Sequence, residues 1–309
     1  MDIVNEVFKL KKETGAVILA HNYQSPEVQD VADFVGDSLE LSVKALESRA
    51  RVIVFAGVDF MAEQAAILNE DSIVLHPNPE AQCPMAQMIT IEELRKFKKL
   101  YPEAPAIVYV NSPAIVKAEA DYVVTSANVV ELVRSLSSDV VIFGPDAHLA
   151  QYIAERTGKV VIPVPRDGYC PIHIKFNANN IQKLIKIYGK ACFIAHPECP
   201  KSVRDLAQFV GSTSQMVKYV KTSGERVFIV GTEIGIIYRM VKENPDKIFI
   251  PASTEAICED MKKITLDKVL KSLRERVYRV LVDRAIAIRV RKAIENTFNV
   301  LGVDAPWKR

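Results

Sequence analysis

The chain has little excess charge of either sign and no long hydrophobic run. Its 40 Lys and Arg residues against 38 Asp and Glu residues give a net charge of +2, which provides no general affinity for nucleic acid. No uninterrupted apolar stretch reaches the roughly 18 residues of a membrane span, and the first residues lack the basic-then-apolar pattern of a secretory leader. These absences predict a cytoplasmic protein that binds neither nucleic acid nor membrane.

Cysteine is scarce, and its number argues against a disulfide framework. The five cysteines are an odd number, and a chain without a secretory signal is expected to keep its thiols reduced or to use them as metal ligands. The sequence also lacks a Gly/Ser-rich linker and low-complexity segments. Because 309 residues exceed the size of one ordinary domain, we expect several units that pack tightly together.

What the sequence does contain is a threefold internal repeat. Cys83, Cys170 and Cys258 lie 87 and 88 residues apart, and the same interval, to within one residue, relates positions throughout the chain. The further equivalent sets are His21, Tyr109 and His196; Tyr23, Asn111 and Glu198; Ser38, Ser126 and Thr213; Asp59, Asp146 and Glu233; and Thr90, Asn177 and Thr265. We interpret the chain as three repeats, residues 1–87, 88–174 and 175–309, the last including a C-terminal tail.

Each repeat alternates short apolar runs with amphipathic stretches, which predicts four strands separated by three helices. In the first copy the expected strands are 16–20, 34–36, 52–56 and 73–75, with helices over 39–48 and 60–68. Such alternation is typical of an α/β fold with a parallel sheet covered on both faces. We therefore predict three α/β/α units related by a pseudo-threefold axis, followed by tail helices over about 265–277 and 283–300.

The polar members of the equivalent sets all follow predicted strands. Carboxyl ends of parallel strands share one edge of a sheet, and open α/β sheets bind their ligands at that edge. If the three units surround a pseudo-threefold axis, these edges converge on one central cavity. Three thiols at equivalent sites then suggest a shared metal centre.

Several of these residues also have a purely structural interpretation. Thr90, Asn177 and Thr265 are competent N-caps, and Ser38, Ser126 and Thr213 have the same alternative. Three acids are expected to be caps or first-turn acids that favour the helix dipole: Asp59, Asp146 and Glu233. We interpret Cys192 and Cys199 as buried apolar residues, His76 and His148 as structural, and Arg289, Arg291 and Lys292 as a solvated basic face.

A set of motifs gives the chain a family resemblance. They are His21-Asn22-Tyr23-Gln24, Gly36-Asp37-Ser38, Gly57-Val58-Asp59-Phe60-Met61-Ala62-Glu63, Cys83-Pro84-Met85-Ala86, Tyr109-Val110-Asn111-Ser112, Thr125-Ser126-Ala127-Asn128, His196-Pro197-Glu198-Cys199-Pro200 and Gly211-Ser212-Thr213. Together they resemble the quinolinate synthase family, the iron–sulfur enzymes of de novo NAD biosynthesis, from the N-terminus to at least Leu266. The chain departs from the family pattern at Tyr169 and within 258–262, and neither change removes a cysteine. Beyond residue 280 the resemblance is too loose to imply a role for any residue.

The resemblance implies a [4Fe-4S] cluster held by Cys83, Cys170 and Cys258. Such clusters normally take four thiolates, so three leave one iron free to act as a Lewis acid. In the family, iminoaspartate condenses with dihydroxyacetone phosphate, and loss of phosphate and water gives quinolinate. The resemblance therefore implies these two small-molecule substrates and a functional link to the enzyme that makes iminoaspartate.

The resemblance also assigns roles around the expected cavity. Residues expected to hold substrate are His21, Ser38, Tyr109, Asn111, Ser126, His196, Glu198 and Thr213. Residues expected to transfer protons are Tyr23, His173, His196 and Glu198, with Glu198 and Tyr23 as the principal pair. Hydroxyl groups at helix starts suit the two carboxylates and one phosphate of such substrates.

Two hypotheses from other classes compete with this one. A three-cysteine site could hold zinc, but zinc sites usually draw two ligands from a short C-x-x-C or H-x-x-x-H segment, and none of the three cysteines has such a partner. Alternatively, three sugar-phosphate-type units could form a binding module without catalysis. That reading leaves Tyr23, His196 and Glu198 beside a metal site without a purpose.

Overall fold

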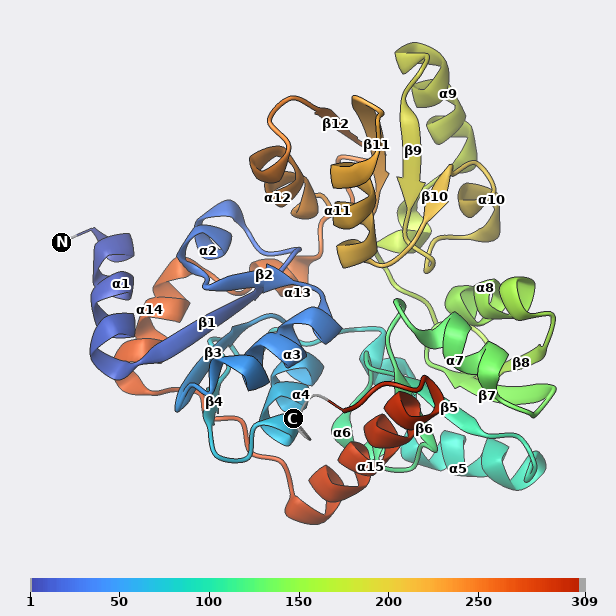
Figure 1. Cartoon of the computed structure of the whole chain (residues 1–309), viewed down its shortest axis with the longest axis horizontal. Helices are drawn as coiled ribbons and strands as arrows, with labels where there is room; N and C mark the ends of the chain where they lie inside the picture. Colours follow the sequence, from blue (N-terminus) through green and yellow to red (C-terminus); the bar gives the residue numbers. More distant parts are fainter. Residues whose placement is uncertain (1, 306–309) are drawn as a thin grey trace.

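The computed structural model describes residues 2–305, and the chain folds there into three parallel sheets of four strands each. Every sheet has the same strand order, with the first and third strands of the unit at its centre and the second and fourth at its edges. In Figure 1 the three units lie around a common centre like the corners of a triangle. The predicted α/β class with three equivalent units is confirmed, whereas the repeat limits 1–87, 88–174 and 175–309 remain a prediction.

The first unit has its strands and helices in the predicted order. Its elements are α1 (Ile3–Thr14), β1 (Ala16–His21), α2 (Pro26–Val31), β2 (Phe34–Gly36), α3 (Ser38–Ser48), β3 (Val52–Ala56), α4 (Asp59–Leu68) and β4 (Ile73–Leu75). β1 extends one residue beyond the prediction, to His21. α3 begins at Ser38 because Asp37 is its N-cap, accepting hydrogen bonds from the backbone N–H groups of Leu39 and Glu40.

The second unit repeats this arrangement. Its elements are the short 3-10 helix η1 (Ala86–Met88), α5 (Ile91–Leu100), β5 (Ala106–Tyr109), α6 (Ala114–Lys117), β6 (Tyr122–Val124), α7 (Val129–Ser135), β7 (Val140–Gly144), α8 (Ala147–Thr157) and β8 (Val160–Pro163). The predicted cap Thr90 accepts a hydrogen bond from the backbone N–H of Glu93 at the start of α5.

The third unit begins with the 3-10 helix that carries His173. Its elements are η2 (His173–Lys175), α9 (Ala178–Tyr188), β9 (Cys192–Ala195), α10 (Lys201–Arg204), β10 (Phe209–Val210), α11 (Thr213–Thr222), β11 (Val227–Gly231), α12 (Ile236–Glu243), β12 (Ile248–Pro251) and α13 (Glu259–Lys262). Asn177 caps α9 as predicted. Thr265 occupies the N-cap position of the next helix, but its side chain makes no capping hydrogen bond.

The tail forms two helices, α14 (Leu266–Glu275) and α15 (Arg284–Val300), close to the predicted ranges. It returns to the first two units: α14 packs against α1 and α2, and α15 packs against α4, α6, α7 and β6. Arg289 forms an ion pair with Glu119 at 2.7 Å. Arg291 Nε donates to the Ile67 carbonyl at 2.6 Å. The prediction of a solvated basic face was therefore wrong for Arg291, which is only partly exposed, whereas Arg289 is exposed as expected. The two contacts link α15 to both the second and the first unit.

In every unit, the residue just before the second strand accepts a side-chain hydrogen bond from a backbone N–H of the first strand. The bonds run from the backbone N–H of Ile18 to Asp33 Oδ2 (2.8 Å), of Ala106 to Asp121 Oδ2 (2.7 Å) and of Phe193 to Gln208 Oε1 (2.7 Å). The acceptor is kept although a carboxylate becomes an amide in the third copy. The repeat thus preserves a hydrogen bond that the parallel ladder would otherwise leave unmade.

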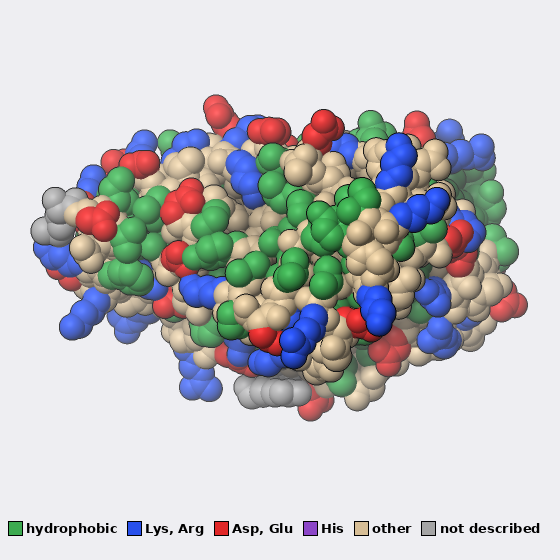
Figure 2. Space-filling view, turned by 90° about the horizontal axis from the view of Figure 1, so that it is seen from above, with side chains coloured by type: hydrophobic (Ala, Val, Ile, Leu, Met, Phe, Trp, Pro, Cys, Tyr) green, Lys and Arg blue, Asp and Glu red, His purple; other side chains and the backbone are tan. Residues whose placement is uncertain are grey.

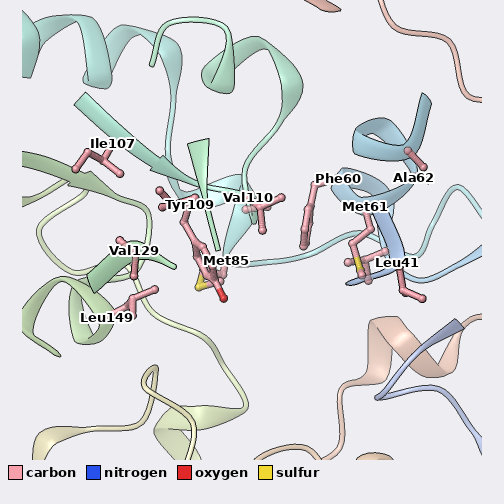
Figure 3. Close-up of a cluster of buried hydrophobic side chains, with 14 of the residues drawn as sticks. Leu41, Phe60, Met61, Ala62, Met85, Ile107, Tyr109, Val110, Val129 and Leu149 are labelled. Atoms are coloured by element: carbon pink, nitrogen blue, oxygen red, sulfur yellow. The ribbon is translucent and has the colours of Figure 1, made fainter. Parts of the chain in front are cut away.

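The first two units share a continuous apolar core. Leu41 of α3 and Phe60 and Met61 of α4 belong to the same buried cluster as Tyr109 and Val110 at the end of β5. Figure 3 shows these side chains gathered between the two units. Because close packing of this kind resists displacement, the strand ends of the two units are held in a fixed relation.

Polar contacts attach the third unit to the other two. Arg204, buried in α10, donates from Nη1 to the carbonyls of Cys199 at 2.6 Å and His148 at 3.2 Å, and from Nη2 to Glu155 Oε2 at 3.0 Å. Arg239 of α12 donates to the Val35 carbonyl of the first unit at 2.7 Å. Each guanidinium therefore fastens one side of the third unit by charge-assisted hydrogen bonds.

The surface carries both signs of charge. Figure 2 shows basic and acidic side chains interspersed on the face seen from above, in keeping with the net charge of +2. Among residues 2–305, no helix is both long and apolar enough to cross a bilayer.

Truncating a core residue of α15 tests how strongly the tail is fastened. Ile294, which is 6% exposed, packs in one cluster with Ile67, Leu68 and Val123. We expect Ile294→Ala to lower the free energy of unfolding by about 2–5 kcal/mol. Ile288→Ala on the same helix, 54% exposed, should change it by less than about 0.5 kcal/mol. Urea unfolding of both variants makes the comparison, and equal losses would contradict the docking of α15.

Candidate active site

A cavity of about 250 Å³ lies where the three units meet. His21 and Tyr109 are the last residues of β1 and β5, and His196 follows β9 directly. All three line the cavity, so the carboxyl edges of the sheets converge as expected from parallel strands.

Every residue singled out from the sequence for catalysis, substrate binding or metal binding lines this cavity. They are His21, Tyr23, Ser38, Cys83, Tyr109, Asn111, Ser126, Cys170, His173, His196, Glu198, Thr213 and Cys258. The two histidines interpreted as structural, His76 and His148, are absent from the lining. His76 Nε2 instead lies 2.9 Å from the Gly57 carbonyl.

The hydroxyl residues near helix starts are not helix caps. The N-cap positions of α3, α7 and α11 belong to Asp37, Asn128 and Ser212. Ser38 and Thr213 are the first residues within α3 and α11, so the alternative of plain caps was wrong. Because a neighbour does the capping, their hydroxyls can face the cavity.

His21 and His196 are neutral and hold their ring proton on the same nitrogen. Each Nδ1 accepts a hydrogen bond from the backbone N–H two residues on, that of Tyr23 at 3.2 Å and that of Glu198 at 3.4 Å. Burial lowers the pKa of both imidazoles to about 3. A neutral ring that accepts at Nδ1 carries its hydrogen on Nε2, and His196 Nε2 lies 3.5 Å from Ser126 Oγ.

Glu198 is the buried anion of the site. It is 3% exposed, and its Oε1 accepts a hydrogen bond from the Tyr109 hydroxyl at 2.7 Å. Its Oε2 lies 2.8 Å from His173 Nδ1, a close contact without the alignment of a hydrogen bond. Burial opposes ionisation, but the nearby His196 and His173 and the bond from Tyr109 outweigh it and hold the pKa of Glu198 below its usual range.

A row of polar side chains connects Tyr23 to Glu198. The Tyr23 hydroxyl lies 2.6 Å from Thr232 Oγ1, which in turn lies 2.9 Å from His173 Nε2. The sequence analysis missed Thr232, which is buried beneath the cavity wall. The equivalent positions hold Val58 and Pro145, so the appearance of a hydroxyl in only one repeat was the available signal.

The two phenols of the cavity stay protonated. Burial raises the pKa of Tyr23 and Tyr109 well above the ordinary value, and the negative charge of Glu198 adds to the effect. Both hydroxyls are therefore hydrogen-bond donors at neutral pH, and each is a source rather than an acceptor of a proton.

The five cysteines fall into two groups. Cys83, Cys170 and Cys258 are free, partly exposed and line the cavity. Cys192 and Cys199 are buried and do not line it. Burial raises the pKa of Cys258 to about 11 and raises those of Cys83 and Cys170 further. A metal would therefore displace protons from these thiols, and three thiols facing one cavity match the donor set of an iron–sulfur cluster.

The cavity also holds a second set of metal-ligand atoms. One atom each of Cys170, His173 and Glu198 lie within 4.8 Å of one another. Sulfur, nitrogen and carboxylate oxygen together form a set that zinc accepts. The short C-x-x-H spacing of Cys170 and His173 is a local pair that the sequence analysis did not consider.

The matching family model and the similar proteins indicate the same family. The model of the family described as "Quinolinate synthetase A protein" matches residues 5–299. Proteins named quinolinate synthase are 49% identical over 97% of this chain in Thermotoga maritima, 52% over 96% in Pyrococcus abyssi and 51% over 97% in Dehalococcoides mccartyi. The matches cover 100%, 98% and 98% of those proteins. Similarity thus continues through α15, well beyond the part of the chain covered by the motifs.

The buried histidines make folding sensitive to acid. A histidine with a pKa of about 3 when folded and 6.5 when unfolded weakens the fold as pH falls through about 6.5, because the unfolded chain takes up the proton first. Between pH 7 and about 5, His196→Gln should therefore lose about 2 kcal/mol less stability than the parent. Urea unfolding at both pH values measures the difference, and an unchanged pH dependence would contradict the neutral state of His196.

Proposed function

The chain belongs to the quinolinate synthase family, enzymes of NAD biosynthesis, and we propose that it condenses iminoaspartate with dihydroxyacetone phosphate to quinolinate, releasing phosphate and water. One observation carries the proposal: the three repeats place all the residues expected for this chemistry around one cavity. A module that only binds ligands is disfavoured, because the relatives are named as enzymes.

We propose that Cys83, Cys170 and Cys258 hold a [4Fe-4S] cluster. Their supply by three different units, at equivalent positions on one cavity, supports this set. When bound, a cluster with three protein thiolates supplies an iron that can act as a Lewis acid toward a substrate oxygen.

Substrate binding falls to neutral donors in this proposal. His21 and His196 offer Nε2–H groups, and Ser38 and Thr213 offer hydroxyls at the N-termini of α3 and α11, where the helix dipole favours anions. Asn22 donates to Thr213 Oγ1 at 3.0 Å and so orients that hydroxyl. Such donors can bind carboxylates and a phosphate without adding a further charged side chain to the cavity beside Glu198.

Proton transfer is assigned to the row from Tyr23 to Glu198. The ionised Glu198 favours a proton on the facing Nδ1 of His173, which leaves Nε2 free to accept from Thr232. Thr232 Oγ1 then accepts from Tyr23, whose ring borders the cavity. Tyr23 can therefore give up or regain a proton at its phenol oxygen during enolisation and elimination, while Glu198 stabilises the charge that reaches His173.

The proposed reaction also has consequences for the partners and the location of the protein. Iminoaspartate has to come from another enzyme, so we propose a functional link to its producer, and both substrates are small molecules. A cytoplasmic location, without nucleic acid or membrane partners, belongs to the same proposal.

Single cysteine substitutions test the metal ligands and separate the two donor sets. After anaerobic purification, Cys83→Ser, Cys170→Ser and Cys258→Ser should each lack the iron and sulfide of the parent, because a cluster needs all three thiolates. Cys192→Ser and Cys199→Ser are the matched controls and should retain both elements.

The same preparation tests the zinc alternative. Zinc held by Cys170, His173 and Glu198 would survive Cys83→Ser and Cys258→Ser and disappear in Glu198→Gln. That pattern, in a colourless parent protein with stoichiometric zinc, would overturn the iron–sulfur assignment.

Removing either end of the proton row tests the catalytic assignment. Tyr23→Phe and Glu198→Gln should keep the cluster spectrum but lower the rate of quinolinate formation by about 100-fold or more. Tyr238→Phe is the control, since that hydroxyl donates to Asp30 on the surface. Near-parental turnover in both cavity variants would remove Tyr23 and Glu198 from the mechanism.

A further inference from the structure

We propose that Asp59, Asp146 and Glu233 are positioning residues that hold the three cavity cysteines in place through the backbone. This role rests on the proposed cluster, because the three acids would fix the positions of its cysteine ligands. It replaces the reading of these acids as helix caps or first-turn acids alone.

The first observation is a hydrogen bond repeated in all three units. The acid at the end of the third strand of each unit accepts a bond from the backbone N–H of the cysteine in the same unit. The pairs are Cys83 to Asp59 Oδ1 (3.0 Å), Cys170 to Asp146 Oδ2 (3.1 Å) and Cys258 to Glu233 Oε1 (3.2 Å). A helix and a strand lie between each acid and its cysteine, so the contact is not imposed by proximity along the chain.

A second hydrogen bond accompanies the first in every unit. The carbonyl of the residue two positions before the cysteine accepts from a backbone N–H at the same strand end. The bonds run from Asp59 to Ala81 (2.9 Å), from Ala147 to Gly168 (2.8 Å) and from Ile234 to Ala256 (3.0 Å). Each cysteine loop is therefore held at two points against its own sheet.

The residues at the second point are small because the loop lies directly on the strand end. A Cβ on Gly168 would come within 1.9 Å of the Pro145 carbonyl oxygen. The equivalent Ala81 and Ala256 are fully buried. At Gly168 the contact leaves no room for a Cβ, whereas the loops of the first and third units accommodate the buried Cβ of Ala81 and Ala256.

The acids divide their oxygens between two tasks. Asp146 Oδ1 caps α8 by accepting from the Leu149 N–H at 2.6 Å, which leaves Oδ2 for Cys170. Glu233 Oε2 accepts from the Gly235 N–H at 2.7 Å, while its Oε1 accepts from the Cys258 N–H and also pairs with Lys262 Nζ at 2.9 Å. Capping alone would use one oxygen, so the second is free to fix the cysteine.

The strand ends are suitable anchors. β3, β7 and β11 lie inside their sheets, while each cysteine lies outside any strand. A cluster requires its sulfurs at set positions, and groups that orient metal ligands typically change metal affinity by about 10–100-fold when removed. A hydrogen bond from each cysteine loop to the end of a central strand therefore restricts the movement of the cysteine and of its thiol.

Asp59 offers the clearest test, because it is only partly buried and its other oxygen binds the exposed Gln87. In the anaerobically purified holoprotein, Asp59→Ala should release iron to a chelator at least about 10-fold faster than the parent. Asp59→Asn keeps an acceptor oxygen and should return close to the parental rate. Gln87→Ala removes only the other bond of Asp59 and should match the parent.

A second variant reaches the same loops without touching a carboxylate. Gly168→Ala should also accelerate iron release, because its Cβ displaces the loop that carries Cys170. Gly224→Ala, where a Cβ meets nothing within 4 Å, is the control and should leave the rate unchanged.

The measured iron content and release rates distinguish a failure of the positioning role from a failure of the proposed cofactor. Parental rates of iron release in both Asp59→Ala and Gly168→Ala, with iron and sulfide fully present, would overturn the positioning role and leave the cofactor intact. A parent protein without iron and sulfide would overturn the proposed cofactor and this inference together. Faster release in both variants, with rescue by Asp59→Asn, establishes the positioning role.

Discussion

The parallel pairing of the strands is the constraint on which the site depends. In each unit, β1, β5 or β9 lies beside the third strand of the sheet, so the side chains that follow both strands emerge at one edge. Three such edges meet at the centre of the molecule. The shared core of the first two units and the guanidinium groups of Arg204 and Arg239 in the third unit keep those edges together. The cavity is thus a consequence of topology repeated three times.

Burial at this centre then decides the protonation states. Removing charged groups from water favours their neutral forms, which keeps His21 and His196 unprotonated and keeps the phenols of Tyr23 and Tyr109 intact. Glu198 is the exception, because partners on both of its oxygens compensate the loss of water. The site therefore combines one fixed negative charge with several neutral hydrogen-bond donors, and the neutral donors suit the anionic substrates proposed above.

The sequence allowed the fold and the lining of the cavity to be predicted, because the repeat multiplied weak signals. A polar residue after one apolar run is ambiguous, but His21 and His196 at equivalent places are not. The features that were not predicted are those that do not recur at equivalent positions. Thr232 occurs in one copy only, and the caps next to Ser38 and Thr213 were obscured by adjacent residues that are equally able to cap. The docking of α15 depended on long-range packing, since an amphipathic face does not specify the surface that will cover it.

The differences among the equivalent positions are as informative as their agreement. Two residues beyond the histidine or tyrosine at each first-strand end stand Tyr23, Asn111 and Glu198, three side chains of different chemistry at the same structural place. Carboxylates at all three would face one another in a buried space, where like charges force protonation and prevent a common ionised state. With one carboxylate, one amide and one phenol, a single anion is held at a known place while its neighbours donate. The three equivalent positions thus carry different side chains, and this difference makes the cavity asymmetric, as the proposed binding of two different substrates and the proposed proton route both require.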